Sequence, residues 1–206
     1  MLTLFLLTNK QTLKKKNNMA SCATLSDILL SQNCTGMMGG IKKVWMIDYD
    51  EITAKPTVST GKITAAPTLD SAATGFVGWK QFEFRKQTSS MTSTLNLDDA
   101  TGLNYVSTDL AMIFSKMETA KRTAVSALGH MGVAAVVLDS NGLYWYLGYD
   151  NPMTISAGTG ETGTSYSDAN QYTITMNDMS VDYPYEIDAE SIATWYLDNG
   201  GIAPQP

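Results

Sequence analysis

The segment 133–148 is apolar on both of its alternating faces, and this constrains the fold more than any other feature of the sequence. Two runs with strand periodicity, 133–140 and 143–148, flank Asn141-Gly142, a pair that accepts the positive φ angles of a two-residue type I′ turn. The pattern predicts a β-hairpin. Because such a hairpin needs cover on both sides, we expect a helix of the same chain or a neighbouring subunit to supply it.

Period-two alternation predicts further strands along most of the chain. They are expected over 41–48, 62–65, 79–86, 91–97, 103–114, 153–156, 171–176 and 184–187. The strands 91–97 and 103–114 flank the short loop 98–102 and predict a long antiparallel hairpin, with alternate residues from Val106 to Phe114 on one face. The polar, Gly/Thr/Ser-rich stretches within 53–75 and 157–170 indicate loops.

Helical spacing appears in the centre of the chain and near its end. Ser115 and Glu118 match a capping box, and an apolar stripe from Met117 to Leu128 precedes Gly129 as the stop. Glu118 and Arg122 form an i,i+4 pair on the other side. Weaker signals predict a short helix from Thr24, and another from Asp188 through Leu197.

Together these elements predict an α+β domain, mainly an antiparallel β-sandwich or small barrel with one packed α-helix. We expect 39–188 to form this β-rich domain and 19–38 to be an N-terminal arm with a short helix. Residues 1–18 are expected to be a disordered extension or the product of a misplaced start codon, and 189–206 a short helix with a flexible tail. The apolar run at 2–7 is far too short to span a bilayer, so no membrane partner is expected.

The charge of the chain is unevenly distributed. Residues 1–122 hold all 14 Lys and Arg with 10 Asp and Glu, whereas 123–206 hold 10 Asp and Glu and no Lys or Arg. A formal net charge of -6 excludes a general basic nucleic-acid binder. A strongly acidic surface repels phosphate, so it can line a path along which DNA moves without sticking; the alternative is a solvated face that aids solubility.

No motif predicts catalysis or a cofactor. Residues 158–163 spell G-x-G-x-x-G, but no helix follows to meet a pyrophosphate, so we interpret them as a loop between strands. One histidine, His130, and two cysteines, Cys22 and Cys34, are too few for the common zinc sites, and no EF-hand order is present. The cysteines can form one disulfide. Five aromatic residues on predicted strands or beside them indicate core or interface anchors more than a sugar-binding platform: Trp45, Trp79, Tyr144, Trp145 and Tyr146.

An ordered set of short patterns resembles virion structural proteins of tailed phages of gut bacteria, including the crAss-like group, of the tail-tube or neck-ring type. The patterns are GGIKKVWMIDYDEI from Gly39, FEFRKQTSSMTSTLN from Phe82, LAMIFSKMETAKRTAVSALGH from Leu110, SNGLYWYLGYDNP from Ser140 and AGTGETGTSYSDANQYTITM from Ala157. The resemblance implies a β-sandwich or barrel with a flanking helix, an annular homo-oligomer, no enzymatic activity and no cofactor. Residues 1–18 depart from it.

This resemblance and the hairpins together lead to a functional hypothesis. The chain is expected to form a ring, of six or twelve copies, in the virion tail or neck, to contact adjacent virion proteins and to touch DNA transiently in its lumen, after assembly in the host cytoplasm. The two apolar hairpins are the candidate interfaces, because long ribbons can pair edge to edge around a ring. The residues chosen from them are Leu143, Tyr144, Trp145, Tyr146, Leu110 and Met112. The alternative is a carbohydrate-binding or receptor-binding β-domain.

Overall fold

The computed structural model describes residues 38–85, 87–98, 100 and 102–202, all within the second of the two units into which the chain divides, Met37–Pro206. Cys22, Cys34 and the helix predicted from Thr24 lie outside the described residues. The elements in chain order are β1 (Ile41–Asp48), a 3-10 turn (Tyr49–Glu51), β2 (Ile52–Ala54), β3 (Thr57–Ser59), β4 (Lys62–Ala65), β5 (Thr68–Leu69), β6 (Lys80–Phe82), β7 (Ser90–Asp98), β8 (Leu103–Ser115), α1 (Thr119–Leu128), β9 (Val133–Asp139), β10 (Tyr144–Leu147), β11 (Thr154–Glu161), β12 (Gln171–Ser180), β13 (Tyr185–Ile187) and two 3-10 turns (Ile192–Trp195, Leu197–Asn199).

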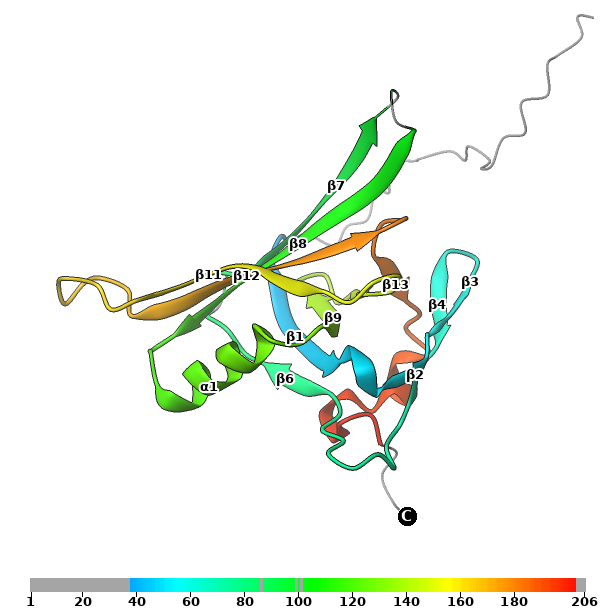
Figure 1. Ribbon diagram of the computed structural model, residues 1–206, viewed down its shortest axis with the longest axis horizontal. Coiled ribbons are helices and arrows are strands. Elements are labelled where there is room, and N and C mark those ends of the chain that lie inside the picture. Colours follow the sequence, from blue (N-terminus) through cyan, green and yellow to red (C-terminus); the bar gives the residue numbers. More distant parts are fainter. Residues whose placement is uncertain (1–37, 86, 99, 101, 203–206) are drawn as a thin grey trace, which may run out of the picture. The chain divides into compact units, whose positions relative to one another are not determined.

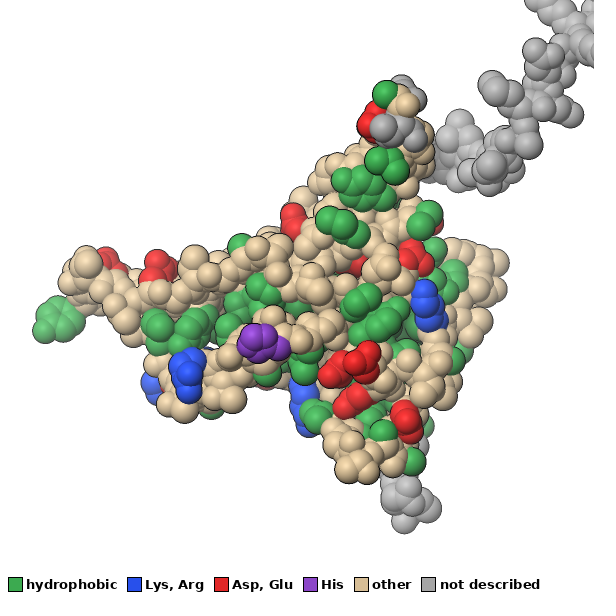
Figure 2. All heavy atoms as spheres, in the orientation of Figure 1, with side chains coloured by type: hydrophobic (Ala, Val, Ile, Leu, Met, Phe, Trp, Pro, Cys, Tyr) green, Lys and Arg blue, Asp and Glu red, His purple; other side chains and the backbone are tan. Residues whose placement is uncertain are grey.

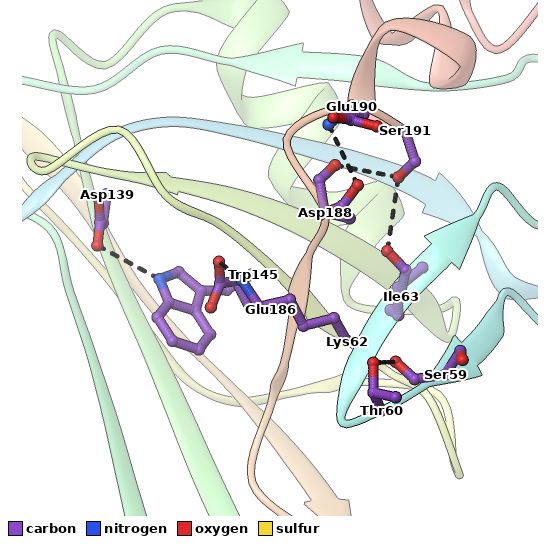
Figure 3. Close-up of polar contacts among 10 residues, drawn as sticks. All are labelled: Ser59, Thr60, Lys62, Ile63, Asp139, Trp145, Glu186, Asp188, Glu190 and Ser191. Carbon is purple, nitrogen blue, oxygen red and sulfur yellow. Dashed lines mark hydrogen bonds and ion pairs between the residues drawn. The ribbon is translucent and has the colours of Figure 1, made fainter.

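Two β-sheets make up most of the structure (Figure 1). The larger has seven strands in the order β3-β4-β13-β10-β9-β1-β6, and the smaller has four in the order β11-β12-β8-β7. Every neighbouring pair is antiparallel except β13 and β4, which run parallel. An ion pair of 2.7 Å between Lys62 Nζ and Glu186 Oε1 joins opposed residues of that parallel pair (Figure 3). The predicted antiparallel α+β sandwich is confirmed.

The central strands are covered on both faces by the chain itself. On β9, Val133, Ala135 and Val137 face a core that is shared with β8 and β12 of the four-stranded sheet. Ala134 and Val136 face a second core, under the C-terminal turns. Strand β9 therefore lies in a middle layer, with one core on each face. The cover that the apolar segment 133–148 requires comes from the same subunit.

The four-stranded sheet is built on two long strands. Strand β8 pairs with β7 over Leu103–Ala111 and with β12 over Val106–Ser115. Its alternate residues from Val106 to Phe114 are all buried, as the period-two pattern predicts. The long hairpin of β7 and β8 is thus confirmed. Its outer part projects beyond the rest of the sheet (Figure 1).

Helix α1 begins three residues later than the capping box predicts, with Glu118 and not Ser115 at the N-cap. The N–H of Lys116 donates to the Asn170 carbonyl at 2.7 Å, and the N–H of Met117 donates to Asn170 Oδ1 at 2.6 Å. These contacts satisfy donors that the Ser115 cap was expected to serve. Glu118 instead occupies the N-cap position without a side-chain cap, and it pairs with Lys121 and Lys116 instead of Arg122.

The buried side of α1 also differs from the predicted one. Leu128 is buried and Val125 packs partly on the core, whereas Ala120 and Ala124 of the predicted stripe are exposed. The alanine-rich face therefore does not pack on a sheet. The face that carries Val125 and Leu128, three residues apart, points toward the core instead.

The turn between β9 and β10 is longer than the predicted type I′ turn. The N–H of Asp139 donates to the Leu143 carbonyl at 3.0 Å, which leaves three residues in the loop. Among the described residues, positive φ is found at Gly142 (+90°) and not at Asn141. A type I turn followed by a left-handed residue gives this geometry. The Asp139 carboxylate fixes it by accepting from the N–H groups of Asn141 and Leu143 and from the Trp145 indole (Figure 3).

The predicted C-terminal helix is broken into two 3-10 turns at Tyr196, which has φ +46°. The break lets Trp195 and Leu197 both reach the second core. Gly200 then accepts a backbone hydrogen bond from Trp79 at 3.3 Å, which connects this part of the chain to the start of β6; the flexible tail stays a prediction. Trp79 itself precedes β6, which is shorter than the predicted strand 79–86.

Candidate assembly interface

The six residues predicted as interface lie in different environments. Leu110 and Met112 are fully buried between the two sheets, and Tyr146 is buried in the second core. These three contact their own chain, because both faces of the hairpin 133–148 are covered from within. Expecting them at a subunit surface was wrong for the folded subunit.

The other three predicted residues remain accessible to a partner. Leu143 is exposed in the turn, and Tyr144 and Trp145 are half-buried on opposite faces of β10. Trp145 lines a depression of about 290 Å³ together with Ile41 and Met91, at the mouth between the two sheets. Their role in an interface stays a prediction.

The two edges of the four-stranded sheet are long, and in their described residues the one feature that interrupts regular pairing is a shift in register on β11, between Ile155 and Ala157. Edge strand β7 has nine residues and edge strand β11 has eight, and neither contains Lys, Arg or Pro. Their charged residues, Asp98 and Glu161, are the last residues of each strand. Soluble proteins usually block such edges with Lys, Pro, bulges or very short strands.

The seven-stranded sheet illustrates that protection. Its edge strands β3 and β6 have three residues each, and β6 begins with Lys80. The contrast within one chain indicates that the edges of the four-stranded sheet are left open for pairing. Sequence reasoning missed β11 as an edge, because residues 157–161 were read as part of a loop.

Strand β11 forms through pairing and not through local propensity. Ala157–Glu161 lie opposite residues 171–175 of β12, although Gly and Thr dominate this part of the strand. Gly158 and Gly160 of the G-x-G-x-x-G pattern are therefore strand residues, which agrees with rejecting a dinucleotide loop. The available signal was the predicted strand 153–156, which β11 continues to Glu161.

The outer face of the four-stranded sheet points away from both cores. The cross-strand pairs show which residues lie on this face: every second residue of each of the four strands. None of these residues belongs to a core cluster. Most are Ser, Thr, Asn or Gln; among the described residues of this face, the charged ones are Asp98, Asp109 and Glu161. Asn177 Nδ2 bridges two of its strands by donating to Ser107 Oγ and Asp109 Oδ1 at 2.8 and 2.7 Å. The face is hydroxyl-rich and its charged residues are acidic, but it also carries the exposed apolar side chains of Leu103, Tyr105 and Met179.

Apolar side chains are exposed at the projecting end of the β7–β8 hairpin. Figure 2 shows hydrophobic side chains along this ribbon. The large exposed ones are Leu95, Leu97, Leu103 and Tyr105. Exposed leucines on an edge ribbon are typical of a surface that is covered in an assembly.

The opposite end of the sheet is the loop 162–170, which a carboxylate holds in shape. Asp168 Oδ2 accepts from the N–H groups of Thr164 and Ser165 at 2.8 and 2.7 Å and from the Thr164 hydroxyl at 2.9 Å. Hydrogen bonds from Thr164 and Ser165 stabilise the charged form and hold the pKa of Asp168 well below its usual range. Tyr166 is fully exposed at the loop tip.

One buried carboxylate connects the two sheets. Asp178, on the core side of β12, is 3% exposed, and its Oδ2 accepts from the Gly148 N–H at 3.0 Å just after β10. Oδ1 accepts from the Ser180 hydroxyl. Burial raises the pKa of Asp178, because the ionised form is poorly solvated there.

Other candidates from the sequence do not come together. Trp45, Trp79 and Tyr146 are buried, so the five aromatic residues do not share an exposed platform. In the described part of the chain, no three His, Cys, Asp or Glu residues are placed to hold a metal ion. No described helix is long and apolar enough to cross a membrane.

Comparison with known proteins gives one weak structural likeness. No family model and no curated protein matches the chain. A chain from the "Virion of native gene transfer agent (GTA) particle" is similar with a TM-score of 0.33 and 12% identity, over 58% of this chain and 92% of that one. A likeness of this size does not establish a shared fold or function.

Proposed function

We propose that the protein is a structural subunit of a phage virion tail or neck, whose copies join through the edges of the four-stranded sheet into a ring or tube around DNA. The observation on which this rests is the pair of long edges, β7 and β11, which lack Lys, Arg and Pro; on β11 the regular part runs from Ala157 to Glu161, beyond the shift in register at Ile155. The sequence resemblance to phage virion structural proteins supplies the biological context. Rings of six or twelve copies, seated against adjacent virion proteins, are the expected assemblies.

Strand direction favours a closed assembly. The four strands alternate in direction, so β7 and β11 run antiparallel to each other. When copies related by rotation meet with β7 beside β11, the antiparallel order continues without interruption. The contact joins two different patches of identical chains, and such heterologous contacts close into rings when the rotation divides a full turn.

The stagger of the strands favours the same geometry. Traced through the cross-strand pairs, the middle of β7 lies level with Ser107 of β8, and the middle of β11 lies level with Met112. The offset is five residues, or about 16 Å along the strand direction. The distance from β7 to β11 perpendicular to the strands is three strand spacings, or roughly 14 Å. The slope, about 45–50°, is close to the strand tilt of roughly 35–45° in closed barrels.

The outer face then lines the lumen. It is the face without a core cluster, and its charged residues are acidic. Carboxylates and hydroxyls repel or only weakly bind phosphate, so DNA can pass without being held. The function proposed is mechanical, and no step of it requires a catalytic group.

The oligomeric state of the purified full-length chain tests the proposal. Light scattering after size exclusion and negative-stain microscopy should find rings or tubes, with masses that are multiples of one chain. Thr159→Lys places a charge on edge strand β11 and should reduce assembly, because a Lys on an edge strand opposes pairing. Thr173→Lys is the matched control: it lies opposite Thr159 on the inner strand β12 and should still assemble. A single chain at the highest attainable concentration would overturn the proposal.

A further inference from the structure

A row of apolar side chains on β7 extends the core face of the four-stranded sheet beyond the subunit. Met91 lies opposite Leu110 and packs partly on the core. Leu95 and Leu97 follow on the same face, opposite Val106 and Asn104, and they are 42% and 65% exposed. Because they are on an edge strand, nothing of the described chain covers them laterally.

The other edge has the complementary shape. On the core side of β11, Gly158 and Gly160 lie opposite Ile174 and Tyr172. A Cβ at Gly160 would lie 2.9 Å from Tyr172 Cε1 and 3.2 Å from Met117 Cε, so these two side chains of the same chain already cover this glycine, and Tyr172 is only half-buried. A Cβ at Gly158 would meet only the Thr173 carbonyl, at 4.0 Å, so the space above Gly158 is open.

We infer that Leu95 and Leu97 of one copy pack over Gly158 of the next, beside the Tyr172 ring. The inference rests on the proposed function, since it assumes that β7 pairs with β11. Side chains alternate between the faces of a sheet, so once the edges pair, the core-side row of β7 and the core-side glycines of β11 share one face. The partner is therefore a second copy of this chain.

Shape is the reason to expect this packing. One edge presents large aliphatic side chains, and the other presents backbone with an aromatic ring behind it. Glycine in a strand weakens it unless another group approaches the backbone closely. At Gly160 that group is the chain's own Tyr172. At Gly158, where the space is open, leucine side chains of the neighbouring copy would be that group, and they would extend the core between the sheets around the ring.

Gly158→Leu tests the packing without straining the subunit. Gly158 is not among the residues with positive φ, and its Cβ position is open, so leucine is accommodated in the single chain. Ala157→Leu is the matched control, because it adds the same bulk on the adjacent residue but on the outer face. Sedimentation velocity over a concentration series measures assembly, and far-UV circular dichroism verifies folding.

We expect Gly158→Leu to be folded and to assemble at least about tenfold more weakly, and Ala157→Leu to match the parent. Leu95→Ala should weaken assembly in the same direction, and combining it with Gly158→Leu should restore part of what the latter loses. If Gly158→Leu is folded and assembles like the parent, the packing is wrong while the proposed function stands. If Gly158→Leu does not fold, the two alanine variants decide: the packing is wrong if Leu95→Ala and Leu97→Ala assemble as strongly as the parent. If the parent chain is monomeric, both the packing and the proposed function are wrong.

Discussion

Replacing Asp178 probes the connection between the two sheets. Its carboxylate accepts from the buried N–H of Gly148, which follows β10, whereas Asp178 itself belongs to β12. Asp178→Ala leaves that N–H without a partner. An unsatisfied buried donor costs about 1–3 kcal/mol. This is a substantial part of the free energy of unfolding of a domain, which is typically about 5–15 kcal/mol.

Urea unfolding, followed by tryptophan fluorescence at a concentration where the chain is monomeric, measures this effect. With a urea dependence of about 2 kcal/mol per molar, the midpoint of Asp178→Ala should fall by roughly 0.5–1.5 M. Asp182→Ala removes the same charge from an exposed position and should change stability by less than about 0.5 kcal/mol. Equal midpoints for Asp178→Ala and the parent would refute the assigned role.

The pH dependence gives the same residue a second test. Burial raises the pKa of Asp178 in the folded chain above its unfolded value, so the folded chain binds the proton more tightly. Its contribution to stability is therefore greatest at acid pH and is lost as the pH rises through the raised pKa. Asp178→Asn keeps an oxygen acceptor but does not titrate. Relative to the parent, it should gain stability between pH 4 and 7; parallel pH profiles would contradict this.

Two further substitutions test the assignments of core and loop. Met112→Ala should lower the free energy of unfolding, measured in urea, by about 2–5 kcal/mol, because it leaves a cavity at a fully buried position between the sheets. The folded fraction should assemble like the parent. A variant that is as stable as the parent but does not assemble would show that Met112 belongs to the interface. Asp168→Ala should accelerate chymotrypsin cleavage at Tyr166 severalfold without moving the unfolding midpoint, since the lost hydrogen bonds are confined to the loop. Because these bonds lower the pKa of Asp168, the protection in the parent should persist in mild acid, and its loss near pH 4 would contradict the assignment.

Local patterns predicted the strands well where alternation was strong. The predicted strands 41–48 and 62–65 coincide with β1 and β4, and the long hairpin 91–114 is confirmed. Burial forces alternation on these segments, so their sequences record it. Residues 157–161 carry no such record, because an edge strand of Gly and Thr buries little, and only pairing with β12 shows that it is a strand.

The remaining errors share a cause in long-range contacts. Asn170 holds Lys116 and Met117 from more than fifty residues away and so delays helix α1. The cover of the 133–148 hairpin comes from β8, β12 and the C-terminal turns, none of which is adjacent to it in sequence. Apolar patterning predicted that Leu110, Met112 and Tyr146 are buried, but it did not distinguish burial by their own chain from burial by another copy.

If the two edges pair as proposed, each chain is, in polymer-chemistry terms, a difunctional monomer of the A–B type. Such monomers can grow into open filaments or close into rings. The fixed slope between the edge strands sets the rotation between neighbouring copies, and this rotation decides between the two outcomes. Cyclisation is favoured once the last gap is one unit wide, because the two ends are then held at high effective concentration. Closure would thereby leave no reactive terminus, and the size of the product would be set by the twist of a single small sheet.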